Sequence, residues 1–215
     1  MQVQDLERRW RRLCERVGAE GDPGAVFALL DRCYREPHRH YHTWEHVEEC
    51  LRVLDWARPL AAEPEAVEMA LWFHDAVYDP RAGDNEERSA DLARQSAAAM
   101  GVEQGFAGRV GELILATRLG PPKSGGGAGD ALLVGDVDLS ILGSPPRRFR
   151  RYERSIRREY AWVPLPEYRL RRGQLLQGLL ARPQLYATGP FRERYEARAR
   201  QNLHWSLQRL GLPPG

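Results

Sequence analysis

The sequence predicts an all-α protein, and two observations lead to that fold class. Apolar residues recur at the spacing of an amphipathic helix in nearly every segment between glycines and prolines. No segment shows the convincing alternation of polar and apolar residues that is typical of a half-buried strand. The chain has 215 residues, of which 42% are hydrophobic and 29% are charged, as in a compact globular domain. We therefore expect one helical domain over residues 1–215.

The expected helices follow one another between short breaks. Leu6, Trp10, Leu13 and Val17 form the apolar stripe of the first helix, because these positions share one helical face. A similar stripe or a helix-start signal supports each of the later helices. Together the expected helices cover residues 6–17, 25–34, 43–57, 64–78, 84–100, 104–119, 131–142, 146–160, 166–182 and 191–210.

Helix boundaries are best marked around the fourth and fifth helices. Pro64 suits a first helical position, and the fourth helix has to stop before Asp79-Pro80. Asp84 followed by Glu87 resembles a capping box that starts the fifth helix. Gly101 is placed to close that helix.

Charge and cysteine content narrow the class of protein. The formal charge of +2 gives no argument for a nucleic-acid or membrane partner. Cys14, Cys33 and Cys50 lack the spacing of a zinc ribbon or a disulfide framework, so they are interpreted as small buried hydrophobic residues in a reducing compartment. Residues 1–12 are too charged for a signal peptide, and no stretch approaches the ~20 apolar residues that span a bilayer. We expect a cytoplasmic protein with no membrane partner.

Histidines are concentrated in one short segment. Four of the six lie within His38–His46. His42 and His46 are four residues apart, which on a helix places both on one face, where they can serve one site. The pair His74-Asp75 falls on the expected inward face of the fourth helix.

Carboxylates in apolar surroundings accompany these histidines. Asp75 is on an inward face, and Asp136 and Asp138 lie in the otherwise apolar segment 132–142. Burying an ionised carboxylate is costly unless a cation or donors compensate it. Three helices thus each offer inward nitrogen or oxygen ligands, and a transition-metal ion is their simplest common partner.

The order His46, His74-Asp75, Asp138 resembles the H...HD...D signature of the HD superfamily of metal-dependent phosphohydrolases. Longer strings resemble its branch of predicted metal-dependent HD phosphohydrolases, and together they extend over most of the chain. These strings are Tyr41–Val47, Phe73–Pro80, Asp84–Ala90, Asp136–Gly143, Ile156–Tyr160 and Ala197–Leu203.

The resemblance implies an HD-type helical bundle with a metal site between its helices. It implies that His46, His74, Asp75 and Asp138 ligate a divalent ion, which this ligand set leaves open among Mn, Fe, Co, Ni, Mg and Zn. Asp136 remains the alternative acid, with a role as helix N-cap as its other interpretation. Relatives often carry a further histidine shortly after the position of Thr117. The absence of that histidine from this chain favours a site with one metal ion.

Three further residues are catalytic candidates through the same resemblance. His42 resembles a histidine that protonates the leaving oxygen, although a structural role is equally open. Asn85 and Glu86 resemble residues near the metal-bound water, and helix capping explains the same segment as well.

An arginine-rich helix offers a phosphate-binding surface. Seven arginines lie between Arg147 and Arg158, which is typical of a solvated helix face but also of a rim that attracts phosphate. Arg157, Arg169 and Arg172 are the candidate substrate-binding residues. Nucleic acid is disfavoured, because the aromatic residues of this helix face the core and leave none for base stacking. The segment Gly120–Gly129 lacks the order of a phosphate-binding loop and is interpreted as a surface connection.

The resemblance implies hydrolysis of a phosphate ester of a small substrate, either a nucleotide or another phosphorylated metabolite, through metal-activated water. The alternative is a non-catalytic helical domain that contains a metal and binds a ligand or a regulator.

Overall fold

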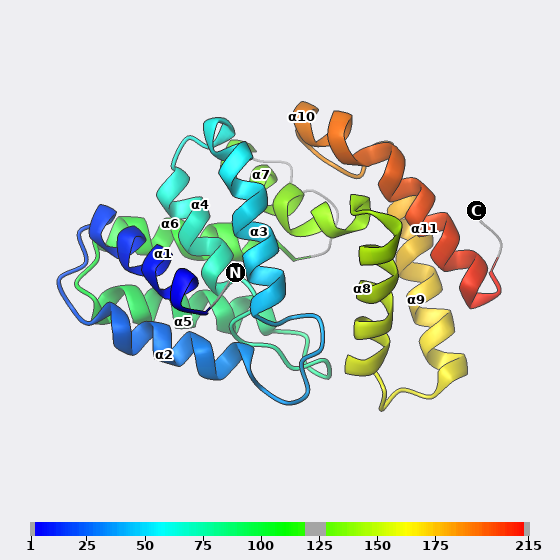
Figure 1. Cartoon of the computed structure of the whole chain (residues 1–215), viewed down its shortest axis with the longest axis horizontal. Helices are drawn as coiled ribbons and strands as arrows, with labels where there is room; N and C mark the ends of the chain where they lie inside the picture. The colour runs from blue at the N-terminus through cyan, green and yellow to red at the C-terminus, as the bar shows by residue number, and fades with distance from the viewer. Residues whose placement is uncertain (1–2, 119–127, 213–215) are drawn as a thin grey trace. The chain divides into compact units, whose positions relative to one another are not determined.

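The computed structural model describes residues 3–118 and 128–212, and within these ranges every regular element is helical (Figure 1). The all-α fold class is therefore confirmed. The chain divides into two compact units, of which the first ends at Val137 and the second begins at Asp138. No helix in the described ranges is both long and apolar enough to cross a membrane.

The first unit is built around a helix that is buried on all sides. This is α4, whose residues from Ala66 to Phe73 are all buried and which packs against α1, α3, α5 and α6. Trp10 of α1 packs edge-on against Trp72 of α4, with ring centroids 5.5 Å apart. The helices of this part of the chain are α1 (Val3–Arg16), α2 (Pro23–Tyr34), α3 (Trp44–Ala57), α4 (Pro64–Phe73), α5 (Asn85–Ala99), α6 (Gln104–Leu115) and α7 (Ala128–Asp138), with a short 3-10 turn at Arg58–Leu60.

Helix α4 begins at Pro64 as expected, but it ends at Phe73, well before Asp79-Pro80. The reason is a contact with a distant segment, because Arg39 donates hydrogen bonds to the backbone carbonyls of Asp75 and Ala76. Those carbonyls are then satisfied without a further helical turn. The expectation that His74 and Asp75 lie within the fourth helix was wrong, since His74 is its C-cap and Asp75 belongs to the following turn.

The helix expected to begin at Thr43 begins at Trp44, and Thr43 is its N-cap with an extended backbone. His42 therefore precedes α3, and the prediction that His42 and His46 share a helix face was wrong. The amide of Thr43 donates to the carbonyl of Tyr41, which turns the chain sharply just before the helix.

Two smaller expectations about helix ends were also wrong. The side chain of Asp84 caps no amide, and Glu87 pairs with Arg118 instead, with 2.7 Å between the charged atoms, so the capping box does not form. Asp136 lies inside α7 and is not an N-cap. Most of the segment Gly120–Gly129 lies outside the described residues, and α7 begins at Ala128.

The second unit packs α8 and α9 against the last long helix, α11. Asn202 of α11 donates to the carbonyls of Leu142 and Ser144 at 2.7 and 2.9 Å, which fixes the turn that precedes α8. The apolar stripe of α8 is buried at Phe149, Tyr152 and Ile156, as expected. The elements are a 3-10 turn (Leu139–Gly143), α8 (Pro146–Glu159), α9 (Leu165–Leu180), α10 (Gly189–Phe191), a π-helical turn (Arg192–Glu196) and α11 (Ala197–Leu210).

Candidate metal centre

Two buried imidazoles face each other in the first unit. His46 is in the first turn of α3 and His74 caps the end of α4; their exposed fractions are 1% and 2%. The Nε2 atoms of the two rings are 3.0 Å apart. Two consecutive helices thus bring the same ring nitrogen of each histidine to one point.

The far side of each ring is held by a hydrogen bond. Nδ1 of His74 lies 3.0 Å from the carbonyl oxygen of Leu71, which can only accept, so Nδ1 carries a proton. This bond orients the ring of His74 so that Nε2 points toward His46. Nδ1 of His46 lies 2.9 Å from the hydroxyl of Tyr41, which can hold that ring in the same tautomer. Such bonds on the far nitrogen are typical of metal-ligating histidines.

Asp75 brings a carboxylate to the same point. Its Oδ2 lies 3.1 Å from Nε2 of His74 and 3.4 Å from Nε2 of His46. Burial by itself would raise the pKa of Asp75, but the imidazoles of His74, His42 and His46 outweigh it and hold that pKa well below its usual range. The carboxylate is therefore ionised. Because its side chain is 21% exposed, it can still be reached from solvent.

Two further donors accompany the histidines. His46, Cys50, His74 and Asp138 each offer one ligand atom, and these atoms all lie within 4.8 Å of one another. Asp138 is the last residue of α7, whose preceding residues belong to the first unit. Cys50 was missed as a site residue, although its spacing of four from His46 on α3 is the signal that could have indicated it.

This donor set fits a metal ion. The Nε2 atoms of the two imidazoles lie 3.0 Å apart, and the Asp75 carboxylate lies 3.1 Å from one of them and 3.4 Å from the other, so nitrogen and oxygen donors converge on one buried point. A cation at that point satisfies all three groups at once. Imidazole and carboxylate suit Zn, Fe, Co, Ni and Mn, and a thiolate at Cys50 would favour the softer ions among them.

Arg39 organises the backbone around the site, a role that the sequence did not reveal. Its guanidinium is buried between the rings of Tyr34 and Tyr78 and bonds the carbonyls of His42, Asp75 and Ala76. It therefore joins the turn before α3 to the turn after α4. These are the two segments that carry His42 and Asp75.

The catalytic candidates lie around these turns with different surroundings. The half-buried ring of His42 stacks on Tyr78 with 4.0 Å between ring centroids. It is one of the imidazoles that lower the pKa of Asp75. Asn85 exchanges two hydrogen bonds with the backbone of Asp79, which fixes the start of α5 against the turn. Glu86 lies half-buried in the first turn of α5.

Of the two acids at the end of α7, Asp138 is half-buried and joins the histidines, whereas Asp136 is buried and lies outside that group.

The candidate arginines all lie in the second unit. Arg172 is buried and donates to the hydroxyl of Tyr152 and to Glu153 at 2.9 and 2.6 Å.

The other two arginines differ from Arg172 in their surroundings. Arg157 bonds the carbonyls of Tyr160 and Val163 beyond the end of α8. Arg169 is exposed on α9.

Comparisons of the chain with protein-family models, with curated proteins and with solved structures yielded no match.

Proposed function

We propose that this chain is a metal-dependent phosphohydrolase of the HD type that hydrolyses a phosphate ester of a small metabolite, with a nucleotide as the favoured substrate. The observation that carries the proposal is the meeting of His46 Nε2, His74 Nε2 and the Asp75 carboxylate at one buried point. The resemblance of the sequence strings around these residues to that superfamily supplies the reaction class.

His46, His74, Asp75 and Asp138 would hold the ion. The ion would supply a lowered pKa for water and would neutralise negative charge on the phosphoryl group. Tyr41 and the carbonyl of Leu71 orient the two imidazoles, so that their Nε2 atoms need no rearrangement on binding. Cys50 is the alternative fourth donor.

His42 is placed to handle a proton next to this point. Its ring is not on α3, but it stacks on Tyr78 and packs edge-on against the ring of His46, with 6.1 Å between the two ring centroids. We assign it the transfer of a proton to the leaving oxygen of the ester. Asn85 holds the turn after α4 through its two hydrogen bonds with Asp79, and Glu86 is proposed near the metal-bound water on the resemblance alone.

We further propose that the protein is cytoplasmic and that its substrate is a small phosphorylated molecule. Cys14, Cys33 and Cys50 form no disulfide in the described residues. Of the candidate substrate-binding arginines, Arg169 is exposed, while Arg157 and Arg172 already hold protein groups.

The direct test is phosphate release by metal-free protein from a panel of nucleotides, sugar phosphates and nitrophenyl phosphate. Each substrate is assayed with and without added Mn, Co, Ni, Mg or Zn. We expect release only with an added ion, and loss of release in Asp75→Asn. Asp91→Asn, which changes an exposed carboxylate on α5, is the matched control and should retain release. A chain that binds the ion but releases phosphate from no substrate would instead be the non-catalytic domain.

A further inference from the structure

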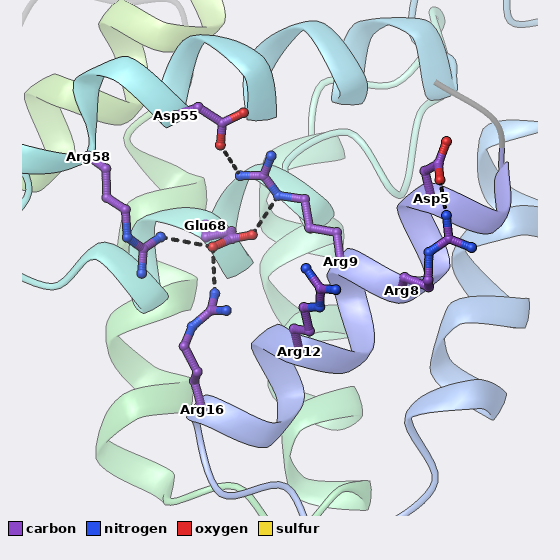
Figure 2. Close-up of a pocket in the computed structure, with 8 residues that line it drawn as sticks. All are labelled: Asp5, Arg8, Arg9, Arg12, Arg16, Asp55, Arg58 and Glu68. Atoms are coloured by element: carbon purple, nitrogen blue, oxygen red, sulfur yellow. Dashed lines mark hydrogen bonds and ion pairs between the residues drawn. The ribbon is translucent and has the colours of Figure 1, made fainter.

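A second cluster of charged side chains lies in the first unit, away from the histidines. It lines a pocket of about 710 Å³ to which α1, α3, the 3-10 turn after it and α4 all contribute (Figure 2). Five arginines and three carboxylates line it: Arg8, Arg9, Arg12, Arg16, Arg58, Asp5, Asp55 and Glu68. The volume is within the range of pockets that hold small ligands, roughly 300–1,000 Å³.

Glu68 is the buried carboxylate on which three arginines of the pocket converge. This residue of α4 is 2% exposed, yet its carboxylate accepts from three guanidinium groups. The distances are 2.8 Å to Arg9, 2.8 Å to Arg16 and 3.0 Å to Arg58. A buried carboxylate with three charged donors is compensated, and it fixes the three guanidinium groups around one point. Figure 2 shows these three side chains converging on Glu68 from α1 and from the end of α3.

The arginines retain donors that Glu68 does not use. Arg16 and Arg58 are 40% and 33% exposed, and each also pairs with Glu65, but a guanidinium has five N–H groups and these two carboxylates do not use all of them. Arg12 is exposed and has no hydrogen bond or ion pair with any other residue in the described ranges. In Figure 2 it rises from α1 between Arg9 and Arg16, with its guanidinium directed toward the cluster. Even with Glu65 counted, the five arginines outnumber the carboxylates that pair with them or line the pocket, and within the described residues Arg12 has no counter-ion.

We infer that this pocket binds a compact polyphosphate group, with Arg12 as the residue that closes on it. Guanidinium groups bind phosphate through paired N–H donors, and a cluster fixed by Glu68 loses little freedom on binding. None of the lining residues is aromatic, so a nucleobase has nothing to stack on and the phosphates themselves carry the affinity. Asp5 and Asp55 flank the arginines and would repel a long polyanion, which favours a short chain of phosphates.

The site is separate from the metal centre. Asp55 is nine residues beyond His46 on α3, which at about 1.5 Å per residue places it roughly 14 Å further along the helix. Glu68 is likewise more than one turn before His74. The inference therefore stands or falls independently of the proposed hydrolase activity.

Calorimetric titration of metal-free full-length protein tests the inference, with inorganic tripolyphosphate, adenosine triphosphate and adenosine as probes. We expect tripolyphosphate and adenosine triphosphate to bind with similar affinity, and adenosine not to bind. Arg12→Ala should weaken both about tenfold, because it removes a charged donor. Arg11→Ala is the matched control, since Arg11 lies on the same helix, pairs with Glu7 and does not line the pocket.

Three results would overturn the inference. One is the absence of tripolyphosphate binding to the wild-type protein. Another is equal weakening by Arg11→Ala and Arg12→Ala, which would indicate non-specific attraction to α1. The third is binding of adenosine triphosphate without binding of tripolyphosphate, because the nucleoside would then carry the affinity. Arg12 is exposed and makes no hydrogen bond or ion pair in the described residues, so its variant is expected to fold, and unchanged circular dichroism checks that.

Discussion

The imidazole of His42 stands apart from those of His46 and His74 in what it contacts. The two buried histidines share a point with Asp75, whereas His42 stacks on Tyr78 at the edge of the site. A histidine in that position can exchange a proton with a bound substrate without being a ligand. This distinction can be tested by varying the leaving group.

We predict that His42→Ala retains metal and loses turnover on substrates with poor leaving groups. General acid catalysis typically contributes ~10²–10⁴ in rate, so kcat should fall by about that range for an alkyl phosphate. The loss should shrink for nitrophenyl phosphate, because nitrophenolate leaves without a proton. An equal loss for both substrates would remove the acid role, and loss of metal would make His42 a ligand.

Cys14 provides a pH-dependent prediction at the residue scale. It is fully buried in α1 beside Met100, and burial raises the pKa of its thiol from 9.0 to about 12. In the unfolded chain the thiol ionises near its ordinary pKa, so the unfolded state binds fewer protons across that interval. The contribution of the Cys14 thiol to the free energy of unfolding is therefore fully present below about pH 9. It is lost as the pH rises toward about 12.

The measurement is the free energy of unfolding in urea at several alkaline pH values for wild type and Cys14→Ala. The wild type should lose up to about 1.4 kcal/mol per pH unit more than the variant over this interval. Because tyrosines also titrate there, only the difference between the two proteins is informative. Parallel pH dependences would contradict the assignment.

At the scale of elements, α4 depends on one buried charge. Glu68 lies on a helix that is otherwise buried among apolar side chains, and it is compensated by Arg9, Arg16 and Arg58. We predict that Glu68→Gln lowers the free energy of unfolding by about 3–5 kcal/mol, because three guanidinium groups lose their buried counter-ion. Glu65→Gln is the control, since this half-buried residue pairs with Arg16 and Arg58 and should cost about 1 kcal/mol or less. Similar costs for both would show that burial of Glu68 has no special effect.

Element boundaries show where the sequence predicts well and where it does not. Pro64 and Pro146 mark helix starts correctly, because the fixed backbone angle of proline is a local property. The end of α4 was misplaced, because it depends on Arg39, which lies more than thirty residues earlier and takes the carbonyls of Asp75 and Ala76. No local pattern contains that contact.

The candidate site was likewise predictable only where its residues form an unusual local pattern. The histidine cluster and the His74-Asp75 pair were noticed because both are unusual in composition. The structure places Asp138 in one group with His46, Cys50 and His74, and Asp75 contacts the two imidazoles from the turn after α4. His74 and Asp75 reach this point from a helix cap and a turn rather than from a helix face. Cys50 and Arg39 were overlooked, since a lone cysteine and a lone arginine carry no signal until their neighbours are known.

At the scale of the whole molecule, the candidate ligand residues come from α3, from the end of α4 and the turn after it, and from the end of α7. They meet only when the chain is folded, so binding of an ion is coupled to folding and should raise the melting temperature. A site assembled in this way has a defined number of ions, which makes its occupancy the most direct quantity to measure.

The decisive measurement is the metal content per chain after reconstitution with a divalent ion and dialysis, for wild type, Asp75→Asn, Asp138→Asn and Asp136→Asn. We predict about one ion per wild-type chain, loss of the ion in Asp75→Asn and Asp138→Asn, and retention in Asp136→Asn. Loss in Asp136→Asn with retention in Asp138→Asn would reverse the assignment within α7, and a content near two would contradict a mononuclear site. Wild-type protein with no metal above background would contradict the metal centre itself.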